Sequence, residues 1–283
     1  ETFGYADRFD EKYDMCRSLR NGQWKYVRNY QAFYPDSLQN NYRYRMPAYQ
    51  EWRQLYREGK LDRIQARFFE PKPVEALYDL EADPYETQNL ATDPQYAGRL
   101  LELRRRLQDR VRQLPDLSFF PESVLLKEAV EDPVAFGRNR RDEIARLADI
   151  ADLSLLPFEQ ARPELARALA SDNPWCRYWA LIACSCFGEI ASELIPAVRE
   201  RLNDRNLLVR ARAAEFLGGV GAEDPCPHLV EILNATDAPA EALLVLNTAT
   251  YVHDHLPGYR FDAEKLHLRV KDRQVKRRLE YLL

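Results

Sequence analysis

An internal repeat near the end of the chain constrains the fold more than any other feature of the sequence. The segment Leu169–Ala180 aligns with Leu202–Ala213 at a shift of 33 residues, and Gly188 aligns with Gly221 at the same shift. A weaker third copy begins at Leu233. Each copy combines a helix that ends in leucine, a polar turn and an alanine-rich helix, which is the pattern of stacked helix pairs. The sequence therefore predicts an all-α repeat region.

These helix pairs resemble HEAT-type repeats of the short bacterial kind, and we expect them to fill residues 159–283. Arg177 and Arg210 occupy equivalent positions in two copies, so we expect them to bridge neighbouring repeats by bonding acidic or carbonyl groups in the turns. A repeat array of this kind can bind a protein partner, which is one expectation for this region. By itself the architecture names no activity.

The first part of the chain has the pattern of a small antiparallel sheet. Asn21-Gly22 separates two strand-like runs, Met15–Leu19 and Trp24–Asn29, and Asn-Gly between such runs is a strong hairpin signal because both residues tolerate positive φ. Glu75–Leu80 is a third strand-like run, which we expect to pair with the hairpin.

Three helices are expected beside these strands, over Pro47–Arg57, Leu61–Phe69 and Pro94–Leu114. The last of them carries apolar residues three and four positions apart, which gives one stripe for packing. Residues 1–120 are therefore predicted to form an α+β unit of a small antiparallel sheet with packed helices. Residues 121–158, divided by several prolines, are predicted to be a helical connector.

The composition excludes several classes of function. The chain has 283 residues with 41 basic and 45 acidic side chains, so no overall charge favours nucleic acid or a membrane as partner. No uninterrupted apolar run reaches the ~18 residues of a membrane span. Five cysteines, an odd number on mostly apolar sequence, do not form a disulfide framework.

Several ordered motifs resemble a known family. Glu75–Leu90, followed by Ala91–Pro94, resembles the C-terminal signature of type I, formylglycine-dependent sulfatases, especially bacterial ones similar to N-sulfoglucosamine sulfohydrolase. Arg17–Asn29 resembles a strand pair of that family, and Tyr5–Asp14 resembles the stretch that enters its C-terminal subdomain. The resemblance implies the C-terminal portion of an enzyme that hydrolyses sulfate esters or sulfamates on sulfated glycans. It also implies a periplasmic or secreted location.

The same resemblance implies that the catalytic part lies upstream and is missing from this chain. Such enzymes use a formylglycine made from the Cys or Ser of a C/S-x-P-x-R motif, together with a calcium ion. Cys16–Arg20 has the Cys and Arg of that motif, but Ser18 stands where Pro or Ala is required. We therefore predict that Cys16 is a structural thiol and that the chain holds no catalytic residue, metal ligand or cofactor. Its expected partner is the upstream catalytic domain, and the chain alone is predicted to be inactive.

Five residues of the entry stretch and the first predicted strand are candidates for substrate binding. An arginine here can form a bidentate pair with a sulfate or uronate group of a substrate. The alternative is that the five residues form an ionic network at a domain interface. The candidates are Asp7, Arg8, Asp10, Glu11 and Arg17.

Two other functions remain open from the sequence. One is another hydrolase of the alkaline phosphatase superfamily, such as a phosphodiesterase or phosphonate hydrolase, that shares this C-terminal subdomain. The other is a non-enzymatic scaffold of HEAT-type repeats that binds proteins.

Overall fold

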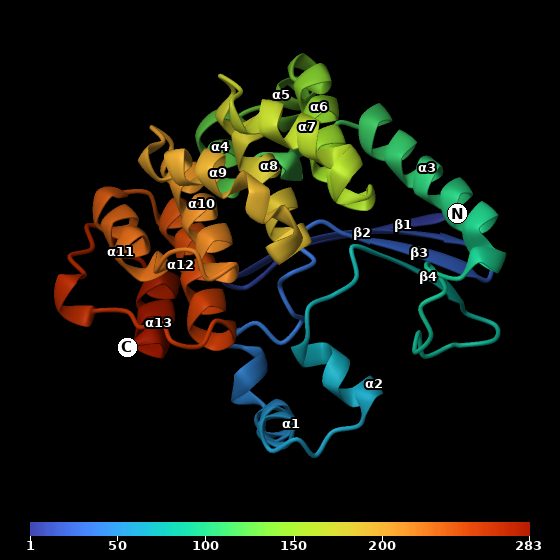
Figure 1. Cartoon of the computed structure of the whole chain (residues 1–283), viewed down its shortest axis with the longest axis horizontal. Coiled ribbons are helices and arrows are strands. Elements are labelled where there is room, and N and C mark those ends of the chain that lie inside the picture. Colours follow the sequence, from blue (N-terminus) through green and yellow to red (C-terminus); the bar gives the residue numbers. More distant parts are fainter.

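The computed structural model describes the backbone of residues 1–283 and every side chain except that of Ala263. A four-stranded antiparallel sheet lies at one end of the molecule, and layers of helices fill the other end (Figure 1). The prediction of an α+β fold followed by a helical repeat region is confirmed.

The sheet has the strand order β1-β2-β3-β4. Its strands are β1 (Thr2–Phe9), β2 (Lys12–Asn21), β3 (Trp24–Asn29) and β4 (Glu75–Asp79). The predicted hairpin joins β2 to β3, and Gly22 adopts a φ of 59° in its turn, a conformation that glycine reaches at little cost. The three predicted strands are therefore present, and β2 begins three residues earlier than predicted.

Strand β1 was not predicted. It is an edge strand whose side chains are mostly exposed or half-buried, so its sequence lacks the alternation of apolar and polar residues that marks a half-buried strand. The pairing with β2 is interrupted between Ala6 and Arg8, where Asp7 alone stands opposite Asp14 and Met15, so the extra residue of this bulge lies on β2. Asp10 adopts a φ of 50° in the turn that follows.

Helices beside the sheet begin and end close to the predicted bounds. Helix α1 spans Pro47–Arg57, as predicted. The predicted helix Leu61–Phe69 is two pieces, α2 (Arg63–Ala66) and the 3-10 helix η2 (Arg67–Phe69). The predicted helix Pro94–Leu114 begins as a 3-10 turn and continues as α3 (Ala97–Gln113). In Figure 1, α1 and α2 project away from the helical layers and the sheet.

Helix α3 covers one face of the sheet. Its apolar stripe packs against inward-facing side chains of β2, β3 and β4, and together they form a small separate core. The buried members of this core are Leu19, Tyr26, Leu77, Leu90, Leu100, Leu103 and Leu107.

The remaining helices form the connector and the repeats. The α-helices are α4 (Glu122–Glu128), α5 (Pro133–Asn139), α6 (Arg141–Asp152), α7 (Phe158–Leu169), α8 (Pro174–Phe187), α9 (Ile195–Glu200), α10 (Leu207–Gly219), α11 (Pro225–Ala235), α12 (Pro239–His255) and α13 (Arg273–Leu282). Short 3-10 helices are η1 (Arg43–Arg45), η3 (Pro94–Tyr96), η4 (Leu117–Phe119), η5 (Leu153–Leu155), η6 (Gly188–Leu194), η7 (Arg201–Asn203) and η8 (Ala263–Lys265).

The repeat visible in the sequence is present in the structure. Asn173 caps α8 and Asn206 caps α10, and each side chain accepts hydrogen bonds from two backbone N–H groups of the first helical turn. Such a cap satisfies donors that have no partner within the helix. Gly188 and Gly221, at the same shift, both adopt positive φ values, of 57° and 67°.

The two equivalent arginines bond to the next helix pair in different ways. Arg177 pairs with the buried carboxylate of Asp204 through Nε at 2.6 Å and Nη2 at 2.8 Å, and it also donates to the carbonyl of Ser171. This bridge between turns confirms the prediction. Arg210 instead bonds Glu231 of helix α11 at 2.6 Å, and the Glu231 side chain is largely exposed.

These two bridges predict unequal effects on stability. We expect Arg177→Met to lower the free energy of unfolding by about 2–3 kcal/mol, because it leaves the Asp204 carboxylate buried without its cation. Arg210→Met is the matched control and should cost less than about 1 kcal/mol, because the carboxylate that it leaves without a partner, Glu231, is 66% exposed. Urea unfolding of both variants measures the difference, and equal losses would contradict the assignment.

One hydrophobic core joins the first part of the chain to the repeats. The segment after β3 lies against the second helix of each pair: Tyr30 packs on Trp179 of α8, with ring centres 6.0 Å apart, and Phe33 packs on Tyr251 of α12, at 5.6 Å. The segment after β3 therefore already covers these positions on α8 and α12. The protein partner expected on the repeats and the bounds 1–120, 121–158 and 159–283 stay predictions.

By length and composition alone, the helical run Pro174–Asn203 could cross a membrane. In the structure this run is four consecutive helical elements, of which α8 is the first. Helix α8 lies among α6, α7 and α10, and most of its apolar side chains are buried there. It therefore packs as a core helix of this fold.

Candidate functional site

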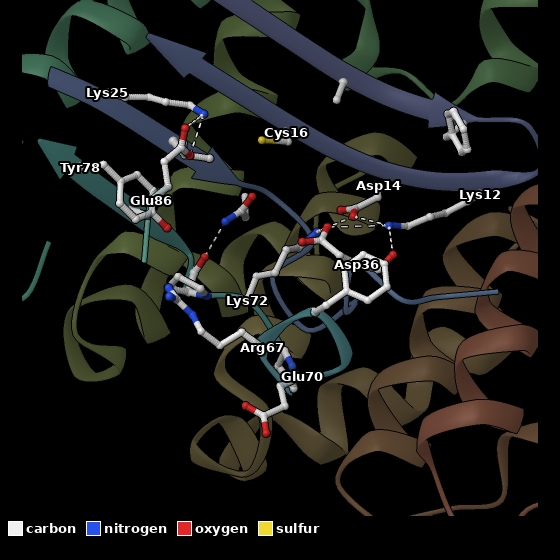
Figure 2. A pocket seen from close by; sticks show the side chains of 18 of the residues that line it. Lys12, Asp14, Cys16, Lys25, Asp36, Arg67, Glu70, Lys72, Tyr78 and Glu86 are labelled. Carbon is white, nitrogen blue, oxygen red and sulfur yellow. Dashed lines mark hydrogen bonds and ion pairs between the residues drawn. The ribbon is translucent and has the colours of Figure 1, made fainter. Parts of the chain in front are cut away.

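The face of the sheet opposite α3 is open and forms the floor of a hollow of about 750 Å³. Side chains alternate along β2, so Tyr13 and Met15 are buried in the helical core, whereas Lys12, Asp14 and Cys16 line the hollow. Its walls come from residues 64–73 and 85–87 (Figure 2).

Four charged residues form a compact group in the hollow, which we call the floor cluster: Lys12, Asp14, Asp36 and Lys72. The ammonium of Lys12 lies 3.1 Å from Asp14 Oδ2 and 3.9 Å from Asp36 Oδ1. Lys72 pairs closely with Asp14 and lies 3.7 Å from Asp36 Oδ1. Figure 2 shows Lys12, Asp14 and Asp36 converging on this point.

Asp14 is the central member of the floor cluster. Its side chain is only 10% exposed, and its Oδ1 atom accepts no hydrogen bond from any described residue. Burial raises the pKa of Asp14, but the attraction of Lys72 and Lys12 outweighs burial and leaves the pKa below its ordinary value. Asp14 is therefore ionised at neutral pH, and its buried Oδ1 atom has no hydrogen-bond donor among the described residues.

The two lysines respond differently to the same surroundings. Burial lowers the pKa of Lys12, and the nearby Asp14 only partly offsets it. Burial also acts to lower the pKa of Lys72, but the attraction of Asp14 and Asp36 outweighs it, so this pKa is raised. The Asp14 carboxylate thus stabilises the charge of Lys72 more than that of Lys12.

The walls of the hollow carry further cations. Lys25 forms a close pair with Glu86, at 2.6 and 2.7 Å from its two carboxylate oxygens. Arg67 donates to the carbonyl oxygen of Thr87, and Arg43 donates to that of Asp36. Within the part of the chain that the structure describes, neither arginine has a carboxylate partner, so both guanidinium charges are uncompensated.

Cys16 is the one sulfur that lines the hollow, among the described residues. It lies in the middle of β2, and burial raises the pKa of its thiol to about 11. A nucleophilic cysteine needs a lowered pKa, so this environment disfavours the reactive thiolate.

The raised pKa predicts slow alkylation of Cys16. At pH 8, iodoacetamide should modify it about a hundredfold more slowly than in the urea-unfolded protein, because the pKa rises from 9.0 to about 11. Between these two values the unfolded thiol ionises first, so the contribution of Cys16 to stability falls as pH rises. Mass spectrometry of the Cys16 peptide measures the rate, and equal rates in both states would contradict the prediction.

The first group of sequence-predicted site residues lies where β1 and β2 meet the start of η4. Arg17 is buried and holds Asp116 through two hydrogen bonds, of 2.6 and 3.0 Å. Asp7 of β1, opposite the bulge of β2, lies 2.7 Å from the same guanidinium. Arg17 is on the covered face of the sheet, so it does not line the hollow.

Arg8 and Asp10 lie at the far end of the β1–β2 hairpin. Arg8 pairs with Glu122 of α4, where Nη1 lies 2.6 Å from Oε2, and Nη2 donates to Gln274 of α13 at 2.7 Å. Its Nε donates to the carbonyl of Asp10, whose own side chain is exposed. These bonds tie the hairpin to the first and last helices of the helical region.

Glu11 is buried in the same turn. Its carboxylate accepts a hydrogen bond from the backbone N–H of Asn41 at 2.7 Å, and its carbonyl accepts one from Arg278 of α13 at 2.9 Å. Asp7, Arg8 and Arg17 thus form ion pairs within the chain, and the Glu11 carboxylate bonds a backbone N–H group. A substrate-binding role for the five stays a prediction.

Sequence analysis did not identify the residues of the floor cluster or the two wall arginines. The sequence did carry a signal for Lys12 and Asp14. In the segment that forms β2, the apolar residues Tyr13 and Met15 alternate with Lys12, Asp14 and Cys16, which places these three on the opposite face of the strand. Lys72 and Arg67 carried no such signal, since only tertiary packing brings them to the sheet.

No group of three or more His, Cys, Asp or Glu side chains among the described residues has a geometry that could hold a metal ion. The carboxylates of the hollow are paired with lysines instead.

Comparison with known proteins gives two matches. Residues 181–247 match the family model described as HEAT repeats. Separately, the chain is 40% identical over 124 residues to an ulvan-active sulfatase of Formosa agariphila. Part of this chain is homologous to a sulfatase. The match covers 44% of the chain and 21% of the relative, so it spans about a fifth of that protein's length.

Proposed function

We propose that this chain is the C-terminal portion of a formylglycine-dependent sulfatase similar to N-sulfoglucosamine sulfohydrolase. The complete enzyme would hydrolyse sulfate esters or sulfamates on sulfated glycans. The observation that carries the proposal is the 40% identity over 124 residues to a sulfatase named for its action on ulvan.

The structure of the signature segment supports an architectural role for it. Asn89 Oδ1 accepts hydrogen bonds from the backbone N–H groups of Leu77 and Ala91, both at 3.0 Å. Asp83 accepts from Thr87 Oγ1 at 3.0 Å and from the backbone N–H of Gln88 at 2.7 Å. These bonds fix the loop after β4 and direct α3 onto the sheet, which explains why the segment requires these residue types.

In this proposal the catalytic residues lie in one part of the enzyme, and this chain forms a separate structural part. The nucleophile, the calcium ligands and the general acid belong to an upstream catalytic domain, where calcium would polarise the sulfate oxygens. Cys16 has neither the motif nor the pKa of a nucleophile. The open sheet face and its hollow would then face the catalytic domain or the substrate, and residues 1–283 alone would be inactive. A location outside the cytoplasm would give such an enzyme access to sulfated polysaccharides.

The intact mass of the native protein tests the proposal. A mass well above the 33.2 kDa of this sequence, with a formylglycine in a C/S-x-P-x-R peptide, is the expected result. A mass of 33.2 kDa would refute it and favour a scaffold built on HEAT-type repeats. A larger protein with an unmodified serine or threonine nucleophile and two metal ions would favour another alkaline phosphatase superfamily hydrolase.

A further inference from the structure

We infer that the hollow on the open sheet face is a carbohydrate-binding site. Asp14, Lys12 and Lys72 would bind sugar hydroxyl groups, and Arg43 and Arg67 would bind an acidic substituent of the same saccharide. The choice of a sulfated saccharide rests on the proposed function, whereas the site itself is argued from the contacts that follow.

The floor cluster has unused capacity that matches a hydroxyl group. A hydroxyl both donates and accepts a hydrogen bond. Asp14 offers a buried acceptor, Oδ1, that no described residue uses, and such an atom is costly to leave unpaired. Lys12 lies beside it: two of the three N–H groups of its ammonium are directed to Asp14 Oδ2 and to the carbonyl of Asp36, both at 3.1 Å, and the third remains as a donor. Adjacent hydroxyls of one sugar ring can therefore bond to both residues.

The balance of charge in the floor cluster also favours a hydroxylated ligand over a bare anion. Two lysines face two aspartates there, and both ammonium groups contact the same oxygen of Asp14, Oδ2. A free anion would have to approach the unpartnered oxygen of a carboxylate, which repels it. A neutral hydroxyl donates to that oxygen without this penalty.

The wall arginines are placed to bind an acidic substituent. Arg43 lies over the rings of Phe9, Tyr49 and Phe68, at 5.7, 5.5 and 5.1 Å from their centres. Arg67 is anchored on the opposite loop through Thr87. A guanidinium held in this way can form paired hydrogen bonds with a sulfate or carboxylate group.

The dimensions of the hollow fit a short oligosaccharide. Its volume of about 750 Å³ lies within the about 300–1,000 Å³ that is typical of sites for small molecules. Phe9, which pairs with Lys12 across the sheet, also lines it and is 48% exposed, so it offers apolar ring surface to the C–H face of a sugar.

Binding to the 283-residue chain tests the inference without requiring hydrolysis. Isothermal titration is carried out with a sulfated oligosaccharide prepared from ulvan, with the same oligosaccharide after desulfation, and with sodium sulfate. We expect both oligosaccharides to bind, the sulfated one more tightly, and sodium sulfate at equal concentration not to displace them.

Two variants with matched controls locate the binding. Asp14→Asn should weaken the binding of both oligosaccharides at least tenfold, and Arg67→Gln should weaken the sulfated one about tenfold while leaving the desulfated one unchanged. The controls are Asp149→Asn on α6 and Arg106→Gln on α3, outside the hollow. Circular dichroism establishes that each variant is folded, and Arg67→Gln decides the question if Asp14→Asn does not fold.

The inference is overturned if neither oligosaccharide binds, if the folded variants bind like the parent, or if sodium sulfate displaces the sulfated ligand completely. These results are distinguishable from failure of the proposed function. A native protein without formylglycine would refute the sulfatase proposal and leave binding to the 283-residue chain unaffected.

Discussion

Replacing Glu215 by alanine is expected to lower the free energy of unfolding by about 3–5 kcal/mol. Glu215 is 1% exposed and accepts hydrogen bonds from Arg212 at 2.7 Å, from Thr248 at 2.8 Å, and from Tyr34. The alanine variant leaves the Arg212 guanidinium buried without its carboxylate, although Tyr34 and Tyr178 still accept from it. Urea unfolding followed by circular dichroism measures the loss.

The control for this prediction is Glu231→Ala. Glu231 also pairs with an arginine of α10, but its side chain is 66% exposed, so its removal should cost less than about 1 kcal/mol. A loss below about 1 kcal/mol for Glu215→Ala would show that the buried network does not stabilise the contact between the repeats and the first part of the chain.

Arg28→Ala is expected to be similarly destabilising, by about 3–5 kcal/mol. Arg28 on β3 is 2% exposed and reaches across to the end of α6, where it bonds Asp152 at 3.1 Å, the carbonyl of Ala151 at 2.8 Å and Ser154 Oγ at 2.7 Å. Its removal leaves the Asp152 carboxylate, which is 11% exposed, without its cation, although Gln108 still donates to Asp152 and Ser154 Oγ still donates to the carbonyl of Ala151.

Arg20→Ala on the neighbouring strand is the control for Arg28→Ala. Arg20 is exposed and bonds only the carbonyl of Gly22, so the loss should lie within about 0.5 kcal/mol. Tryptophan fluorescence and circular dichroism follow unfolding of the Arg28 variant. An unchanged free energy of unfolding would contradict the role of Arg28. A stable helical region beside an unfolded sheet would show that the two parts fold independently.

The sequence predicted the repeats well because their structural causes are local. Asn173 and Asn206 cap their helices with their own side chains, and Gly188 and Gly221 take backbone conformations that other residues rarely adopt. These causes recur at one shift in the sequence, so a single chain reveals them. The hairpin at Asn21-Gly22 was predictable for the same reason.

The parts that were not predicted depend on contacts between distant segments. Strand β1 is defined by its pairing with β2, and the hollow by the approach of residues 64–73 to the open sheet face. Arg210 shows the same limit within the repeats, because the sequence could not tell that its carboxylate partner lies on α11 and not in a turn. Sequence pattern located the elements, but the residues of the hollow required the tertiary structure.

Release of sulfate from ulvan oligosaccharides tests the central claim most directly. We expect the native protein to release sulfate, to lose this activity when its formylglycine precursor is replaced by alanine, and to need calcium. The 283-residue chain, assayed in parallel, should release none. A native protein that binds the oligosaccharides but releases no sulfate under these conditions would contradict the assignment of this chain to a sulfatase.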